Sequence, residues 1–151
     1  MPYTLSLRSK AELVGVHPDL VRVVEKAIQI TTQDFGVHDG LRTMREQEQY
    51  IAKGASRTRN SKHLKQPDGF GHAVDLVPYI NGKLRWEWGA IWPIARAVRM
   101  ASAEQGVSLI WGGVWDRRLG DLDLVLEDAV EDYCKRHPGP DFLDGPHYQL
   151  A

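Results

Sequence analysis

Two histidines and one aspartate have the residue types and spacing of a metal site. His63 lies in a polar segment, Asp75 lies inside an apolar run, and His147 is near the end of the sequence. Three N and O ligands leave one position of a zinc ion open for a water molecule that can become a nucleophile. A closed structural site rich in thiolates is excluded because Cys134 is the single cysteine. The pattern therefore predicts a catalytic zinc site.

His72 competes with His63 for the first ligand position because it lies even closer to Asp75. If residues 72–76 are extended, His72 and Asp75 point to opposite faces of the strand. This parity favours His63 and makes His72 a partly exposed residue at the strand end. The alternative role for Asp75 is a buried ion pair with Arg42.

Hydrophobic periodicity predicts the elements that must position these residues. Apolar residues at helical spacing predict helices over 18–30 and 88–105 and a third that starts at 122 and ends by 137. The capping-box pattern Thr43 to Glu46 begins a further helix. Apolar runs predict strands over 35–38, 73–80, 107–111 and 147–150. Polar residues with glycine and proline predict a loop over 55–71. Together, these helices and strands predict an α+β domain with a small, mainly antiparallel sheet flanked by helices.

Composition narrows the classes of protein. The 151 residues carry 19 Lys and Arg against 20 Asp and Glu, so the net charge gives no reason to expect nucleic acid as a partner. No run of about 18 apolar residues could span a bilayer. The sequence shows no repeat and no linker long enough to separate a second domain. We therefore expect a single domain over residues 1–151, without stable membrane insertion.

The ordered motifs resemble those of a known family of zinc peptidases. Ser61-x-His63, Gly71-x-Ala73-x-Asp75 and Asp144-x-x-His147 are similar to the motifs of zinc D-Ala-D-Ala carboxypeptidases, their dipeptidase relatives and phage L-alanyl-D-glutamate endopeptidases. The phage endolysin branch is most similar, because further motifs fall in the expected order over most of the chain: Gly40-Leu-Arg42-Thr43, Asp75-Leu-Val-Pro78 and Trp111-Gly-Gly-Val-Trp115. This resemblance implies a Hedgehog/DD-peptidase-like fold and cleavage of the L-alanyl-D-glutamate bond in peptidoglycan stem peptides.

When the family's functional residues are assigned to the matching positions of this sequence, the resemblance implies three zinc ligands: His63, Asp75 and His147. It also implies two catalytic residues, Asp144 and Arg42. Zinc lowers the pKa of its water towards about 7, and a carboxylate such as Asp144 can accept the proton and return it to the leaving amine. Arg42 is always charged and presents a planar fork of donors to a developing oxyanion.

Three further residues are expected at the substrate: Ser61, Trp111 and Trp115. Ser61 can hydrogen-bond the substrate or orient the neighbouring ligand His63. The glycine pair between the tryptophans permits close backbone approach and resembles a cleft wall in the family, while core packing at a strand end is an equal alternative. The remaining tryptophans are expected to pack a helix against the sheet: Trp86, Trp88 and Trp92.

One departure from the family pattern is an insertion. The compact motif has two residues between the first histidine and the glycine, whereas residues 64–70 separate His63 from Gly71 here. Closing a longer flexible loop costs only about 0.6 kcal/mol per doubling of its length. We therefore expect the insertion to alter the loop while the ligands still converge.

Two alternatives to an endolysin remain open. One is a D-Ala-D-Ala carboxypeptidase or dipeptidase with the same site chemistry, and the other is a noncatalytic, zinc-stabilised binding domain. The presence of Asp144 and Arg42 favours an enzyme. The first ten residues lack the basic-then-apolar order of a secretory signal, so we expect a monomer made in the host cytoplasm that reaches the cell wall after membrane permeabilisation, without a separate wall-binding domain.

Overall fold

The structure is a computed structural model that describes residues 2–54, 56, 60–123, 125–139 and 142–151. The helices in these residues are α1 (Leu7–Glu12), α2 (Pro18–Ile30), α3 (Met44–Ala52), α4 (Trp88–Gln105) and α5 (Leu126–Arg136), with a 3-10 turn η1 (Leu119–Asp121). The strands are β1 (Phe35–Asp39), β2 (Ala73–Ile80), β3 (Lys83–Leu84), β4 (Leu109–Gly112), β5 (Val114–Arg118) and β6 (Asp144–Leu150).

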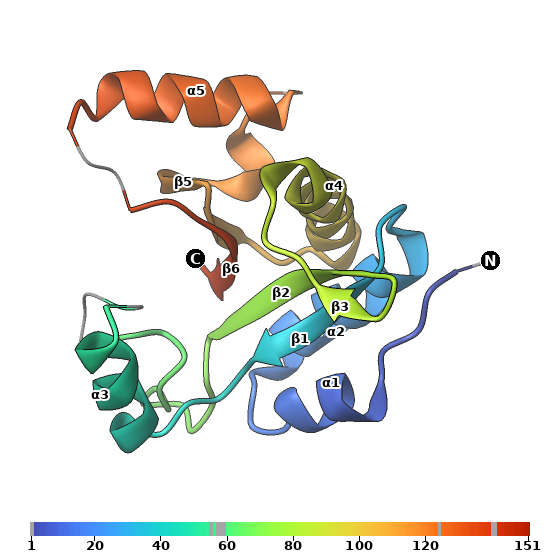
Figure 1. The fold of residues 1–151 in the computed structure, drawn as a ribbon, viewed down its shortest axis with the longest axis vertical. Helices are drawn as coiled ribbons and strands as arrows, with labels where there is room; N and C mark the ends of the chain where they lie inside the picture. The colour runs from blue at the N-terminus through green and yellow to red at the C-terminus, as the bar shows by residue number, and fades with distance from the viewer. Residues whose placement is uncertain (1, 55, 57–59, 124, 140–141) are drawn as a thin grey trace.

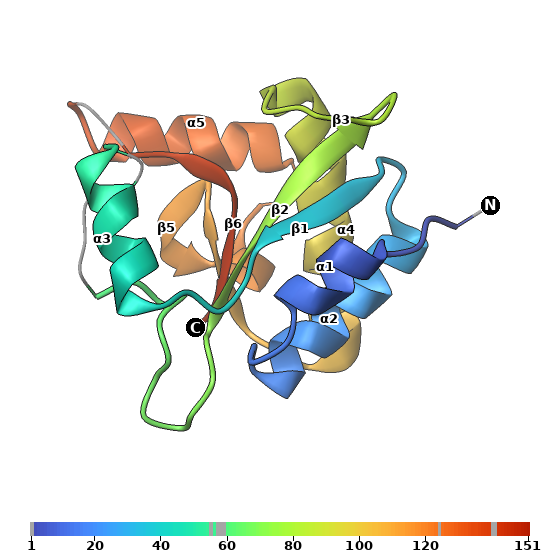
Figure 2. The same cartoon turned by 60° about the horizontal axis from the view of Figure 1, so that its bottom comes forward.

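The strands form one antiparallel sheet in the order β1-β2-β6-β4-β5, with β3 paired to β2 (Figure 1). The last strand of the sequence, β6, is therefore central and pairs with both β2 and β4. Helices α2 and α4 pack against each other over the core face of the sheet, and α1 lies beside the edge strand β1, where Ser9 accepts the N–H of Val37. Figure 2 shows α3 well apart from these three helices. The prediction of an α+β fold with a small antiparallel sheet is confirmed.

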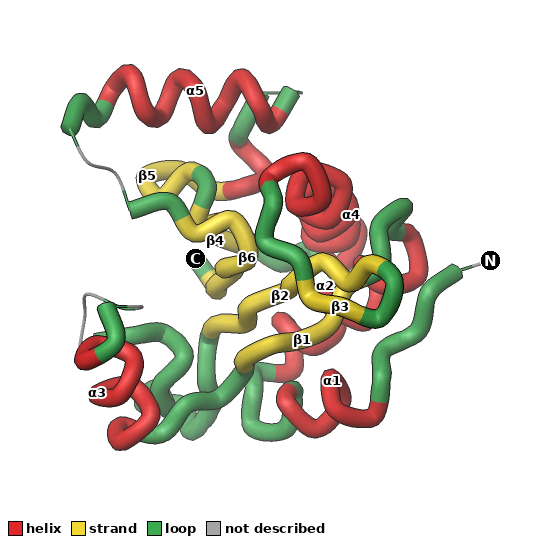
Figure 3. The backbone as a smooth tube through the Cα atoms, in the orientation of Figure 1, coloured by secondary structure: helices red, strands yellow, loops and turns green. Residues whose placement is uncertain are grey.

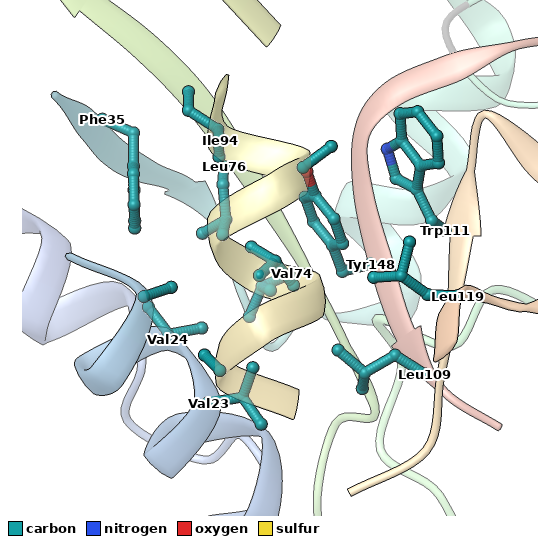
Figure 4. Close-up of a cluster of buried hydrophobic side chains, with 14 of the residues drawn as sticks. Val23, Val24, Phe35, Val74, Leu76, Ile94, Leu109, Trp111, Leu119 and Tyr148 are labelled. Carbon is teal, nitrogen blue, oxygen red and sulfur yellow. The ribbon is translucent and has the colours of Figure 1, made fainter. Parts of the chain in front are cut away.

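The hydrophobic core lies between the sheet and helices α2 and α4. Figure 4 shows side chains from these helices, from η1 and from strands β1, β2, β4 and β6 converging on one cluster. In β2, Val74 and Leu76 are fully buried in this cluster. Because side chains alternate along a strand, Asp75 projects from the opposite face, where α3 lies. Core packing thus directs one ionisable residue of β2 away from the core.

The predicted bounds are confirmed for α2, β2 and α4, whose periodic patterns are long. Thr43 and Glu46 form the predicted capping box of α3. The helix predicted to start at residue 122 begins at Leu126, because η1 and its cap, Leu122, accommodate the first apolar residues of that pattern. Helix α1 and strand β5 were not predicted. In the described part of the chain, no helix is long and apolar enough to cross a membrane.

Candidate metal centre and active site

His63, Asp75 and His147 bring their metal-binding atoms together at one buried point. His63 Nε2 and His147 Nδ1 each lie 3.3 Å from Asp75 Oδ1. One ligand atom from each of the three residues lies within 4.8 Å of the others. The loop before β2, β2 itself and β6 thus assemble a group that can hold a metal ion.

Hydrogen bonds to the opposite ring nitrogens determine which lone pairs face the centre. His63 Nδ1 lies 2.8 Å from the carbonyl oxygen of Gly40, and His147 Nε2 lies 2.9 Å from Oε1 of Gln149, so each of these nitrogens carries a proton and donates it. In the neutral rings, His63 Nε2 and His147 Nδ1 keep lone pairs directed at Asp75. Among the described residues, His63 Nε2 and Asp75 Oδ1 are buried without a hydrogen-bond partner. A bound cation would satisfy both atoms.

The electrostatics of the centre favour positive charge. Burial alone would raise the pKa of the Asp75 carboxyl, but the neighbouring rings of His63 and His147 hold that pKa well below its ordinary value. Burial acts to lower the pKa of His147, yet the Asp75 carboxylate more than offsets this and the pKa is raised. The centre therefore attracts either a proton or a metal cation.

Strand pairing positions two of the three ligands. Asp75 of β2 and His147 of β6 are partners in the antiparallel register. Residues directly opposite each other in such a pair project their side chains to the same face of the sheet. Their meeting is therefore a consequence of sheet register.

Contacts with the chain after β1 position the third ligand, His63. Arg42 donates its backbone N–H to the His63 carbonyl at 2.8 Å, and the hydroxyl of Ser61 accepts the His63 N–H at 3.1 Å. Gly40, which accepts from the His63 ring, must lack a side chain because a Cβ there would lie 1.9 Å from the carbonyl oxygen of Glu12. Tertiary contacts thus hold a ligand that lies outside regular secondary structure.

Asp144 begins β6 beside the metal-binding residues. Its partner in β4 is Gly112, where a Cβ would lie 2.0 Å from the Asp144 carbonyl oxygen. Burial, together with the negative charge of Asp75, raises the pKa of Asp144 to about 6. A carboxyl with this pKa can accept and return a proton near neutral pH, as a general base and acid must.

Arg42 is buried and held by three neighbours. Its Nε and Nη2 both donate to Oδ2 of Asp39, and its Nη1 donates to Oε1 of Gln47 at 2.6 Å. The guanidinium carbon lies 3.9 Å from the centre of the Tyr50 ring. Nη2 also lies 3.7 Å from Oδ2 of Asp75. The ion pair considered for Asp75 is therefore a longer contact, and Asp39 is the closer partner of Arg42.

The site residues line one cavity of about 370 Å³. Its wall contains the metal-binding group, Asp144, Arg42 and Ser61. Nine further residues line it: His38, Tyr50, Ser56, Asn60, Lys62, Trp86, Trp115, Phe142 and Gln149. A metal-binding group, a titratable carboxyl and an oriented guanidinium in one cavity are the parts of a hydrolytic site.

The two tryptophans expected at the substrate have different positions. Trp115 lines the cavity, with its ring 5.1 Å from that of His147. Trp111 is fully buried, and its indole donates to the carbonyl of Gly145 at 2.7 Å. Its assignment as a substrate contact is corrected, because β4 directs the side chain into the core. Trp86 also differs from its predicted packing role, since it is 55% exposed and lines the cavity.

The inserted segment 64–70 folds outside the metal centre. Residues 60–72 contain no helix or strand beyond isolated bridges (Figure 3). His72 points to this segment, with Nε2 2.7 Å from Oδ2 of Asp68, and does not join the metal-binding group. His72 precedes β2 and lies outside the group of His63, Asp75 and His147, in agreement with the preference for His63.

Several supporting residues were absent from the sequence-based site. Gln149 orients His147, and it lies two positions later on the same strand, so strand parity could have identified it. Asp39 lies three residues before Arg42, so its contact with the guanidinium is also local in the sequence. Gln47 and Tyr50 reach Arg42 from α3, and no spacing rule identifies those contacts.

Comparison with known proteins shows the family of this chain. The family model for phage L-alanyl-D-glutamate peptidase matches residues 1–151. An L-alanyl-D-glutamate peptidase of Escherichia phage T5 is 33% identical over 120 residues, which are 77% of this chain and 84% of that protein. The crystal structure of the Serratia marcescens L-Ala D-Glu endopeptidase ChiX aligns with a TM-score of 0.72 and 36% identity, over 98% of this chain and 90% of that one. The chain therefore belongs to the phage L-alanyl-D-glutamate peptidase family.

Proposed function

We propose that this protein is a zinc-dependent endolysin that hydrolyses the L-alanyl-D-glutamate bond of peptidoglycan stem peptides. The observation that carries the proposal is the convergence of His63 Nε2, His147 Nδ1 and Asp75 Oδ1 at one buried point beside Asp144. The family to which the chain belongs supports the choice of bond. It also favours an endopeptidase over the D-Ala-D-Ala exopeptidase alternative.

Zinc is the metal that this donor set fits best. Two imidazole nitrogens and one carboxylate oxygen are characteristic of catalytic zinc sites with three protein ligands. When bound, zinc would lower the pKa of a water molecule and polarise the scissile carbonyl. The paired acceptors on Gly40 and Gln149 keep both imidazoles in the tautomers that such binding requires.

The catalytic steps follow from the groups beside the metal-binding residues. Asp144 accepts a proton from the attacking water and later donates it to the amine of the leaving D-glutamate. Arg42 retains N–H groups that its interactions with Asp39 and Gln47 do not use, and its planar fork stabilises negative charge on the carbonyl oxygen. Because Asp39, Gln47 and Tyr50 orient the guanidinium before substrate binds, little reorganisation is required. Ser61 and Trp115 contact the substrate from the cavity wall.

The proposal includes the setting in which the enzyme acts. Residues 1–151 act as one catalytic domain and as a monomer. The protein is made in the host cytoplasm and reaches the cell wall after the membrane is permeabilised. Gel filtration with light scattering tests the monomer, and a lysis assay on intact and permeabilised host cells tests the access route.

Digestion of purified muropeptides, followed by mass spectrometry of the products, tests the function. Cleavage at the proposed bond releases peptides that begin with D-glutamate and leaves L-alanine as a new carboxyl terminus. Release of D-alanine alone would instead identify the exopeptidase alternative. Elemental analysis of the active protein, followed by chelation and restoration with zinc, tests the metal. Binding of stem peptide without any cleavage would identify a noncatalytic domain.

A further inference from the structure

Lys62 is an exposed cation on the wall of the catalytic cavity, between Ser61 and the metal-binding residue His63. Its carbonyl oxygen accepts the N–H of His72 at 2.7 Å. Ser61 and His63, on either side, are both buried. The backbone that carries Lys62 is therefore held in place, while its ammonium group extends on a flexible stem.

The other permanent cation of the described cavity wall, Arg42, already has a counter-charge in Asp39, and the proposed mechanism uses its remaining N–H groups at the carbonyl oxygen. The Arg42 guanidinium donates to Asp39 and Gln47 and lies over the ring of Tyr50. By contrast, the Lys62 ammonium makes no hydrogen bond or ion pair with any residue in the described part of the chain. A cation in this position is available to an anionic ligand.

The chemistry of the substrate requires such an anion close to the scissile bond. A glutamate joined to alanine through its amine, and to the rest of the peptide through one carboxyl, keeps its other carboxylate free. That charge lies only a few bonds from the leaving nitrogen. The cavity wall also carries the carboxylates of Asp75 and Asp144, which would repel it. Zinc held by Asp75 would offset the charge of that carboxylate, and a cation directed at the substrate would offset the repulsion by Asp144 that remains.

We propose that Lys62 is a specificity-determining residue that pairs with the free carboxylate of the D-glutamate residue. This inference rests on the proposed function and names a determinant of its substrate choice. Lys62 discriminates between a peptide with the free carboxylate and the same peptide with that group converted to a carboxamide. A charge-assisted contact in a partly enclosed site is compatible with a preference of about tenfold.

The test compares kcat/KM for these two synthetic peptides with wild-type protein and Lys62→Met. Wild type should cleave the carboxylate peptide about ten times more efficiently. Lys62→Met should lose that preference through a lower kcat/KM on the carboxylate peptide, with little change on the carboxamide. Lys62→Arg should retain most of the preference because it retains the charge. Lys65→Met is the matched control, since Lys65 is an exposed lysine of the adjacent segment that does not line the cavity.

Zinc content and thermal unfolding of Lys62→Met should equal those of wild type, which separates loss of a substrate contact from damage to His63. If wild type cleaves both peptides and Lys62→Met changes both equally, the Lys62 inference is overturned while the peptidase function stands. If wild type leaves both peptides intact, the proposed function fails and the inference fails with it. Loss of preference in Lys65→Met to the same extent would also overturn the role of Lys62.

Discussion

Asp75 on β2 and His147 on β6 are opposite each other in the antiparallel register, and Oδ1 of Asp75 lies 3.3 Å from Nδ1 of His147. The two residues are far apart in the sequence, so their distance depends on the pairing of a central strand with its neighbour. A shift of one residue in that pairing would move one side chain to the other face of the sheet. The geometry of the candidate metal centre therefore depends on the register between β2 and β6.

Replacing Gln149 with Leu should weaken zinc binding by about 10- to 100-fold without unfolding the protein. The amide oxygen of Gln149 accepts the Nε2 proton of His147, and its loss frees the ring to adopt the wrong tautomer. Competition titration against a chelator of known affinity measures the effect. Gln149→Glu keeps an acceptor at this position and should bind zinc at least as tightly as wild type. Equal weakening in both variants would contradict the orienting role.

Replacing Asp144 with Asn should reduce kcat by about 10²- to 10⁴-fold while the protein still binds zinc. The amide keeps the size of the side chain but cannot accept a proton from water. Muropeptide cleavage measures the loss of kcat, and zinc stoichiometry of the same preparation measures whether the metal is retained. His147→Ala is the contrasting variant, since it should lose metal affinity together with activity. Undiminished cleavage by Asp144→Asn would remove Asp144 from proton transfer.

In the metal-free protein, the Asp144 carboxyl should contribute a growing loss of stability as the pH rises from about 4 to about 6. The pKa of Asp144 is raised from 3.8 to about 6 in the folded protein, so the folded state binds this proton more tightly than the unfolded chain does. The resulting penalty is complete above pH 6. Asp144→Asn should therefore have a higher free energy of unfolding than wild type at pH 8, by up to about 3 kcal/mol, and show little difference at pH 4. Urea unfolding of both proteins with chelator present measures this difference.

Replacing Gly112 with Ala should destabilise the protein by about 3 kcal/mol and inactivate it. The added methyl group would lie 2.0 Å from the carbonyl oxygen of Asp144, which forces β4 and β6 apart at the proposed general base. Gly120→Ala is the matched control, because a Cβ there has no atom within 4 Å. That variant should remain within about 0.5 kcal/mol of wild type. Similar unfolding midpoints for the two variants would contradict the close approach.

Replacing Asp39 with Ala should destabilise the protein by about 3 to 5 kcal/mol, because it leaves the buried guanidinium of Arg42 without its closest counter-charge. The exposed pair Arg22 and Asp19 has the same spacing and is the matched control. Asp19→Ala should cost less than about 1 kcal/mol, since water screens that pair. Equal losses in urea unfolding would show that burial does not distinguish the two pairs.

The sequence by itself determined the elements with long periodic patterns and pointed to the three residues that the structure brings together as a group able to hold a metal ion. Helix α4 and strand β2 have their predicted bounds because burial of one face imposes a regular spacing on apolar residues. Short elements such as α1 and β3 carry too few residues to show a period. The motif around His63 and Asp75 was recognisable because metal binding restricts the residue types at those positions.

Only the tertiary structure decided which groups support those residues. It directed the Trp111 ring into the core, where the indole donates to the carbonyl of Gly145, and it placed the Trp115 ring beside that of His147. It also paired the His63 ring with the carbonyl of Gly40, which sets the tautomer. Such contacts join segments that are distant in the sequence, and any suitable donor or acceptor can make them. They therefore leave no spacing or periodicity that could be recognised before the chain is folded.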